Sequence, residues 1–418
     1  MMTVVAVVVT LSVILLLCSS SQAGGKRRDT TDNGTVTIIF GGGISFDGPV
    51  KYFAEVEKTC DYRRPFEKVR KILATADLRV ASLDSPLLGK AYDESTPQLG
   101  KQTYNYGSID AVEGLKYAGF DIVQVANKQF FDNGVAGVKS TISALKKAGI
   151  AYVGVQDRMN KEASQKPVIK TVNGLKVGFL SYFLISQGCS LNSFMERSRN
   201  ASNGDENVFK LGPVAFNKLT ASNEVQELAK RVDFTVVLMH WGEDYSPIPS
   251  LRVRQIARAL TVFGAKLIIG THPHVLQGHQ CHGSNALAVY SMGNFLAPKY
   301  TGTTSEIFHG GRKPTKQDAL KYAYDAESNY SLTQLGMMFR VTLSKAGIIA
   351  AHHLPIEIKN EPKTNCLQPT PAGTSWIEFC RGFDLYCMNW KDVCASEASM
   401  QDYLKNSPDT SACVKSDS

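Results

Sequence analysis

Residues 234–274 read FTVVLMHWGEDYSPIPSLRVRQIARALTVFGAKLIIGTHPH, and this stretch decides the class of fold. The apolar runs 234–239 and 266–269 predict two buried strands, and residues 251–263 between them have helical spacing. A strand, a helix and a strand in succession are typical of an α/β domain with a largely parallel central sheet. Histidines follow both strands, at the sheet edge where open α/β folds place their ligand sites.

The alternation of strands and helices extends along most of the chain, which predicts an α/β domain built on a largely parallel central sheet. Further strands are expected at 36–40, 78–83, 122–126, 151–155, 168–172, 175–182, 287–290, 337–343 and 347–358, and helices at 66–76, 108–119 and 135–148. Gly41-Gly42-Gly43 is expected to form a loop after the first strand, and Asn173-Gly174 predicts a hairpin turn. The main domain is expected to span 35–360, followed by a small, separate Cys-rich tail at 361–418.

Composition fits a folded domain with a cationic surface. The chain has 418 residues, 43% of them apolar, and Lys plus Arg exceed Asp plus Glu by 46 − 38 = 8. This excess is spread along the chain, and no basic block alternates with aromatic residues. We therefore expect no nucleic-acid binding.

The N-terminus predicts export. Val4 to Cys18 is almost wholly apolar and is followed by Ser21-Gln22-Ala23, which is typical of a signal peptide over residues 1–23. A flexible segment is expected at 24–34. The run is short for a membrane span, so no stable span is expected after cleavage. The alternative is an uncleaved anchor, because Lys26-Arg27-Arg28 follows the apolar run.

The cysteines and three Asn triplets also fit an extracellular protein. After loss of Cys18, eight cysteines remain, and an even number suits a disulfide framework. Five of them lie after residue 365, so full pairing requires a bond between the tail and the main domain. Asn33, Asn200 and Asn329 begin glycosylation triplets, which would make the chain a glycoprotein.

Three histidines at two strand ends predict a shared polar site. His240 ends one strand, and His272 and His274 follow another. Neutral imidazoles and carboxylates are ligands for zinc-like metals. Asp84 follows the strand at 78–83 and can supply a carboxylate. Asn127 and Asp132 follow the strand at 122–126 and can add oxygen ligands or hydrogen-bond partners.

Other conspicuous residues have simpler interpretations. Trp241 is expected to be a packing residue, and Gly293 and Asn294 to be turn formers. His279 and His282 are expected in a loop beside Cys281 without a special role. His352 and His353 are neighbours on a predicted strand and so point to opposite faces.

Five ordered blocks of sequence resemble the CapA family, the bacterial capsule poly-γ-glutamate proteins. The resemblance implies a metallophosphatase-like fold, which is a layered α/β sandwich. The blocks begin at Ala76, Ala118, His240, Gly270 and Tyr290 and read ADLRVASLDSPL, AGFDIVQVANKQFFDNG, HWGED, GTHPHVLQ and YSMGNF. The resemblance covers about residues 36–358. It does not cover the tail after residue 360.

The chain departs from this family at several metal-binding positions. Gly43 stands where the family has an aspartate, Asp84 replaces a glutamate, and Lys128-Gln129 replaces Asn-His. A lysine beside a metal would repel it. The resemblance implies the surviving ligands Asp84, Asn127, His240, His272 and His274, of which Asp84, His240 and His274 would also be catalytic. It implies one divalent ion of the Mn, Zn or Fe type, or none.

The resemblance implies a secreted protein linked to poly-γ-glutamate or to capsule and cell-surface polymer biosynthesis. The expected partner is an anionic polymer such as polyglutamate. If the protein is active, the expected chemistry is hydrolysis or transfer with a metal-bound water as nucleophile. The alternative is a non-catalytic extracellular binding or matrix protein that keeps the cleft without the chemistry.

Overall fold

The structure is a computed structural model that describes most of the predicted main domain. The described residues are 34–89, 106–127, 129–157, 165–184, 211–282, 286–298, 314–323 and 331–378. Several predicted features lie outside the described residues. They are the signal peptide, the asparagines of the three glycosylation triplets, and the cysteines 189, 380, 387, 394 and 413. No helix within these ranges combines the length and the apolar character needed to cross a bilayer.

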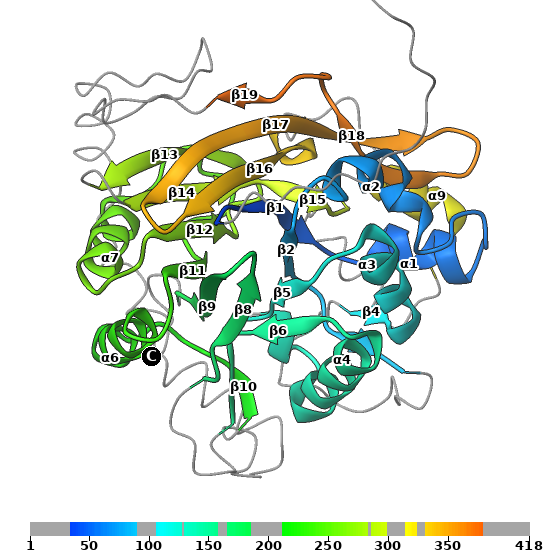
Figure 1. The fold of residues 1–418 in the computed structure, drawn as a ribbon. Helices are drawn as coiled ribbons and strands as arrows, with labels where there is room; N and C mark the ends of the chain where they lie inside the picture. Colours follow the sequence, from blue (N-terminus) through cyan, green and yellow to red (C-terminus); the bar gives the residue numbers. More distant parts are fainter. Residues whose placement is uncertain are drawn as a thin grey trace, which may run out of the picture. The chain divides into compact units, whose positions relative to one another are not determined.

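Two sheets form the centre of the fold (Figure 1). The first has the order β18-β17-β16-β1-β2-β5-β6, with β15 beside β1 and β19 beside β17. β1, β2, β5, β6 and β15 run parallel, and the other strands add antiparallel. Its strands are β1 (Val36–Ile44), β2 (Leu78–Leu83), β5 (Ile122–Gln124), β6 (Ala151–Val153), β15 (Asn294–Leu296), β16 (Leu335–Ser344), β17 (Gly347–Glu361), β18 (Cys366–Pro371) and β19 (Ile377–Glu378).

The second sheet has the order β13-β14-β12-β11-β9-β8. Its four central strands are parallel, and the edge strands β8 and β13 are antiparallel to their neighbours. The strands are β8 (Val168–Val172), β9 (Leu175–Phe183), β11 (Phe234–His240), β12 (Leu267–Thr271), β13 (Leu276–His282) and β14 (Ala286–Met292). Helix–strand alternation predicts a largely parallel central sheet, but it does not reveal that β8, β9 and β11 to β14 pair separately from β1.

Side-chain alternation along the strands builds three apolar layers. In β11, Val236 and Leu238 point into the core between the two sheets, while Val237 and Met239 pack under α6 (Lys218–Ala229) and α7 (Leu251–Val262). The outer face of the first sheet packs against further helices. These are α1 (Gly48–Glu55), α2 (Glu67–Leu73), α3 (Val112–Ala118), α4 (Gly134–Ala148) and α9 (Lys316–Ala323). The layered α/β class is therefore confirmed.

Short elements complete the described fold. Two small two-stranded sheets pair β3 (Leu87–Leu88) with β4 (Gly107–Ser108) and β7 (Val155–Asp157) with β10 (Leu211–Pro213). The 3₁₀ helices are η1 (Arg64–Phe66), η2 (Ile109–Ala111), η3 (Gln129–Phe131) and η6 (Ser331–Gln334).

Glycines 41–43 lie within β1 rather than in the predicted loop. The reason is close packing: a Cβ at Gly41 would press on the Phe295 ring, and one at Gly42 would overlap the Gly293 carbonyl. Here β1 also shifts register against β2 between Phe40 and Gly43. The three glycines thus let β15 approach β1, and they place residue 43 at the carboxyl end of the sheet.

Residues 366–371, which lie within the predicted tail, pair with a strand of the main domain. β18 continues the first sheet beside β17, and Cys366 forms a disulfide with Cys60. Hydrogen bonds join the same regions: Thr59 Oγ1 donates to the Thr364 carbonyl (2.7 Å) and Gln368 Nε2 donates to the Arg64 carbonyl (2.9 Å). Composition marked the change at 360 but could not show this strand pairing.

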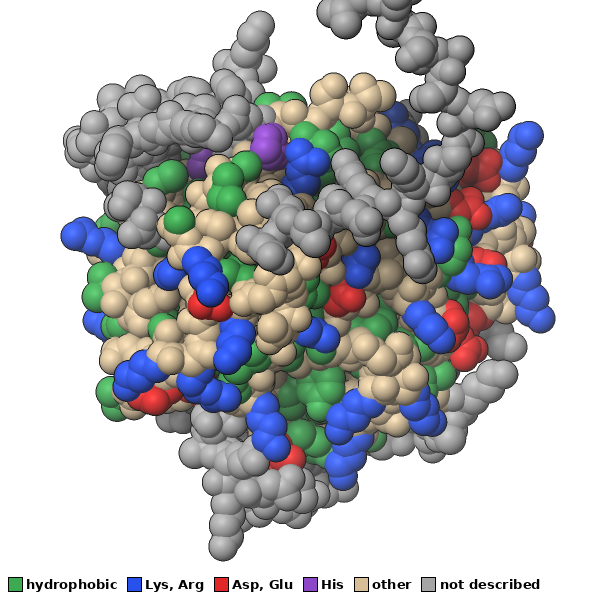
Figure 2. Space-filling view, viewed as in Figure 1, with side chains coloured by type: hydrophobic (Ala, Val, Ile, Leu, Met, Phe, Trp, Pro, Cys, Tyr) green, Lys and Arg blue, Asp and Glu red, His purple; other side chains and the backbone are tan. Residues whose placement is uncertain are grey.

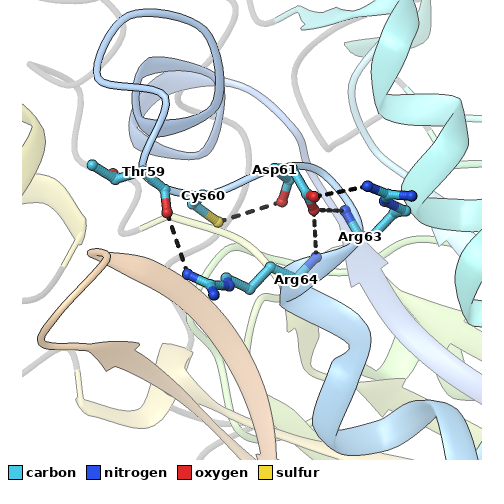
Figure 3. A network of polar contacts seen from close by, with 5 residues as sticks. All are labelled: Thr59, Cys60, Asp61, Arg63 and Arg64. Atoms are coloured by element: carbon cyan, nitrogen blue, oxygen red, sulfur yellow. Dashed lines mark hydrogen bonds and ion pairs between the residues drawn. The ribbon is translucent and has the colours of Figure 1, made fainter.

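A local network holds the turn that carries Cys60 (Figure 3). The Asp61 carboxylate accepts hydrogen bonds from the backbone N–H groups of Arg63 (2.9 Å) and Arg64 (3.0 Å). The Arg64 guanidinium donates back to the Thr59 carbonyl (3.4 Å). The disulfide is thus attached to an ordered turn at the start of η1. Cys281, by contrast, is exposed and carries a free thiol, so the even number of cysteines does not mean that all are paired.

His279 and His282 lie in strand β13, not in the predicted loop, and His279 provides a pH test of the fold. Burial, together with the charge of nearby His353, lowers the pKa of His279 from 6.5 to about 4. The folded chain therefore binds fewer protons than the unfolded chain between these values, and stability falls as the pH drops from about 6.5 to about 4. The loss should reach about 3 kcal/mol, at about 1.4 kcal/mol per pKa unit.

We expect His279→Gln to remove this component of acid destabilisation. Urea unfolding at pH 7 and at pH 4 measures it, with the wild-type chain as reference. A variant whose unfolding free energy drops between these pH values as steeply as that of the wild type would contradict the assignment.

Candidate metal site

Two adjacent strand ends bring the predicted histidines together. His240 is the last residue of β11 and is paired in register with Thr271, the last residue of β12. The His240 and His272 rings consequently lie with centroids 4.6 Å apart, and those of His272 and His274 are 6.1 Å apart. All three side chains are buried. Trp241 is a packing residue as predicted: it is fully buried, and its Nε1 donates to the Tyr290 carbonyl (2.9 Å).

The backbone around these histidines is unusual. His272 has φ 103°, His274 has φ 60° and Tyr245 has φ 64°, in the left-handed region that non-glycine residues rarely adopt. Such conformations cost about 1–3 kcal/mol each and cluster at functional sites. Two backbone hydrogen bonds hold them here, from Trp241 N to the Thr271 carbonyl (3.1 Å) and from Tyr245 N to the Pro273 carbonyl (2.8 Å).

One carboxylate and two imidazoles form a group that suits a metal ion. Asp244, His272 and His274 each offer a ligand atom, and these atoms lie within 4.8 Å of one another. The His272 Nε2 and Asp244 Oδ1 atoms are 3.5 Å apart. A tetrahedral ion with bonds of about 2.0–2.1 Å places its ligand atoms about 3.4 Å apart. Both the donor chemistry and the spacing therefore fit a divalent ion of the Zn, Mn or Fe type.

Asn294 orients His274 through a hydrogen bond to its ring. The Asn294 amide Nδ2 donates to the Thr333 carbonyl (2.9 Å), which fixes the direction of the amide, and its Oδ1 lies 2.9 Å from His274 Nδ1. In that arrangement His274 Nδ1 carries the proton and donates to Asn294, which leaves the Nε2 lone pair for a metal. Metal-binding histidines are commonly held in this way. The sequence favours a turn at Asn294, but in the structure Asn294 begins β15 and its amide holds the His274 ring.

Asp84 approaches the histidine cluster from the other sheet. Its Oδ1 accepts a hydrogen bond from Ser82 Oγ (2.7 Å), and Thr271 Oγ1 lies 3.5 Å from the same Ser82 Oγ. A Cβ on Gly43 would overlap Asp84 Oδ2 and would lie 3.6 Å from Asn294 Oδ1. The position that lacks an aspartate therefore faces both Asp84 and the amide that holds His274.

Asn127 lies just after β5 and is used structurally. Its Nδ2 donates to the Leu83 carbonyl (2.9 Å), and its Oδ1 accepts from the Phe130 N–H (2.8 Å). The first bond ties the ends of β2 and β5 together, and a carbonyl oxygen keeps one lone pair for another partner. Asp132 is buried nearby in sequence. Lys128 lies outside the described residues.

Comparison with known proteins identifies the family. The family model described as "Bacterial capsule synthesis protein PGA_cap" matches residues 37–299, more than half of the chain. This chain belongs to the PGA_cap family. The matched segment contains Asp84, the three histidines, Asp244 and Asn294. The resemblance seen in the sequence blocks is therefore confirmed.

Two curated relatives are both named as CapA biosynthesis proteins. The PGA biosynthesis protein CapA of Bacillus subtilis (strain 168) is 28% identical over 255 residues, which cover 60% of this chain and 62% of that protein. The capsule biosynthesis protein CapA of Bacillus anthracis is 28% identical over 258 residues, which cover 61% and 56%. The chain thus spans less than two thirds of the length of these relatives.

A solved structure, that of the protein TT1561 of Thermus thermophilus, aligns with 62% of this chain and 90% of its own. Its TM-score is 0.35 at 10% identity, and a superposition this loose carries no argument about the fold.

The metal-compatible group of this PGA_cap protein overlaps only in part with the ligands expected from sequence. His272 and His274 belong to it, while Asp84 and His240 do not. Asp244 does belong, and sequence reasoning missed it although it ends the HWGED block. The signal available was an acidic residue in the loop directly after a buried strand that ends in histidine. The spacing of residues along the sequence could not show that the backbone turns and brings Asp244 close to His272.

Proposed function

We propose that this PGA_cap protein acts outside the cell on an anionic polymer of the poly-γ-glutamate type. Asp244, His272 and His274 would hold one divalent ion, and that ion would supply the Lewis acid for hydrolysis or transfer. The observation that carries this proposal is the Asp244–His272–His274 group, whose ligand atoms lie within 4.8 Å. The choice of polymer in this proposal rests on the family description and on the names of the two relatives.

Each side chain of the site has a distinct part in this proposal. A bound ion would supply a Lewis acid that polarises the scissile group and acidifies a water molecule. Asp84, held by Ser82, is the carboxylate that can accept a proton from the attacking group. His240 is buried beside His272, where it can donate a proton to the leaving group. Asn294 keeps His274 in the tautomer that binds.

Export to an oxidising compartment is part of the same proposal. Its support is the apolar stretch before Ala23 and the Cys60–Cys366 disulfide, a type of bond that is rare in reducing compartments. Cleavage after Ala23 gives a secreted protein, and retention of the segment gives a membrane-anchored one.

A second candidate is a non-catalytic binding or matrix protein of the cell surface. Gly43 favours it, because the residue that would face Asp84 has no side chain. A two-metal site with a carboxylate from this position cannot form in this chain.

Cleavage of poly-γ-glutamate distinguishes the two functions. Purified protein loaded with Zn²⁺ or Mn²⁺ should shorten the polymer, measured by gel filtration, and the Asp244→Asn variant should do so at least about 100-fold more slowly, as expected for loss of a metal ligand. Glu243→Gln, one residue away in the same exposed loop, is the matched control and should retain activity. A metal-loaded wild-type chain that leaves the polymer length unchanged would contradict hydrolysis, and polymer binding without any change in length would favour the binding-protein alternative.

A further inference from the structure

A cationic pocket lies at the side of the fold where the edge strands of the two sheets come together. It has a volume of about 700 Å³, within the range of about 300–1,000 Å³ that is usual for ligand pockets. Helix α4 forms one wall, and the segment leading into β8 contributes to another. The lining residues are Lys139, Ile142, Ser143, Lys146, Ala151, Tyr152, Gly154, Val155, Asp157, Lys166, Pro167, Val168 and Leu211. We call it the α4–β8 pocket.

Three lysines line the α4–β8 pocket, and two of them are regularly spaced. Lys139 and Lys146 are seven residues apart in α4 and share one face with Ser143. At a rise of 1.5 Å per residue, the two lysines are about 10 Å apart along the helix axis. Lys166 is a third cation, and Asp157 is the only acidic residue among those lining the pocket. Within the described chain, no ion pair is formed by Lys139 or Lys146.

Part of the lining is apolar. Ile142, Tyr152 and Val155 contribute to it, together with Pro167 and Val168. Figure 2 shows this combination on the surface, with Lys and Arg side chains around an apolar area over β6, α4 and β8. Exposed lysines above an apolar floor suit a ligand that alternates carboxylates with methylene groups.

The α4–β8 pocket begins near the edge of the sheet that carries Asn127. Gly154, which lines it, directly follows β6, and a Cβ there would overlap the Cβ and the backbone N of Ala126. Ala126 precedes Asn127 just after β5. None of the lining residues belongs to the Asp244–His272–His274 group.

We infer that the α4–β8 pocket binds the carboxylates of an acidic polyamide chain and so holds the polymer on the same molecule as the metal site. Lys139 and Lys146 pair with carboxylates along the chain, Ser143 donates a hydrogen bond between them, and the methylene groups cover the apolar floor. The inference rests on the proposed function for the identity of the polymer. It does not depend on metal binding or on catalysis.

Binding of a labelled γ-linked oligoglutamate, followed by fluorescence anisotropy at low salt, tests this assignment. Each exposed ion pair contributes a factor of up to about five in affinity, so Lys139→Gln/Lys146→Gln should weaken binding by about tenfold. Lys147→Gln is the matched control, because Lys147 lies in the same last turn of α4 but does not line the pocket. It should change the dissociation constant less than about twofold. Binding should also weaken as salt rises.

Three results would overturn the inference. The first is no binding to the wild-type chain. The second is that Lys147→Gln weakens binding as much as Lys139→Gln/Lys146→Gln does. The third is tighter binding of inorganic polyphosphate at equal charge through the same lysines. Metal content separates this test from that of the proposed function. The lysine variants should hold as much metal as the wild type. If the chain holds no metal but binds oligoglutamate through these lysines, only the metal chemistry of the proposed function is refuted.

Discussion

The His272→Ala variant should bind Zn²⁺ or Mn²⁺ at least about 100-fold more weakly than the wild-type chain, because loss of a partner that merely supports a ligand already costs about 10- to 100-fold. His272 is central to the cluster, since its ring lies close to both the His240 ring and the Asp244 carboxylate. Two donors would remain, and about four positions are needed for tight tetrahedral binding. Titration calorimetry on the purified chain measures the affinity.

His352→Ala is the matched control for this experiment. It also replaces a histidine by alanine, but His352 lies in β17 and is not part of the metal-compatible group. Its metal affinity should stay within about twofold of the wild type. The assignment fails if His272→Ala retains as much metal as His352→Ala. The His240→Ala variant then shows whether the site extends to the end of β11.

Local sequence patterns were sufficient for the strands that carry the site. β2 was predicted with its observed bounds, and residues 234–239 were placed within β11, because continuous apolar runs mark buried strands. The Asn-Gly pair at 173–174 predicts a hairpin turn because both residue types tolerate positive φ. The structure confirms the turn, and both residues have positive φ. These features depend only on neighbouring residues.

Features that depend on distant contacts could not be predicted. Gly41 to Gly43 look like a loop until β15, far along the chain, is seen to pack against them. Asn294 resembles a turn residue until its amide is found between Thr333 and His274. In each case the residue type was visible, but its partner was determined by the pairing of distant strands.

Gly43 connects the sequence departures with the chemistry of the site. In sequence it is a missing aspartate, and in the fold its absent side chain points at Asp84 Oδ2. A Gly43→Asp change would therefore place two carboxylates against each other, and like charges at that separation repel unless a cation lies between them. There is also a steric obstacle to any side chain at position 43. A Cβ there would overlap Asp84 Oδ2, so the Asp84 side chain must move before residue 43 can carry one.

Removing the Cys60–Cys366 disulfide should lower the unfolding free energy by about 4 kcal/mol, near the upper end for such bonds, because it closes a very long loop. The two cysteines are 306 residues apart, and both are buried. The double variant Cys60→Ala/Cys366→Ala avoids new buried thiols, and urea unfolding under non-reducing conditions measures the change. Cys281→Ser is the matched control: this exposed thiol forms no disulfide, so its effect should stay within about 0.5 kcal/mol. A double variant as stable as Cys281→Ser would mean that β18 is held by strand pairing and by hydrogen bonds such as that of Gln368, without help from the disulfide.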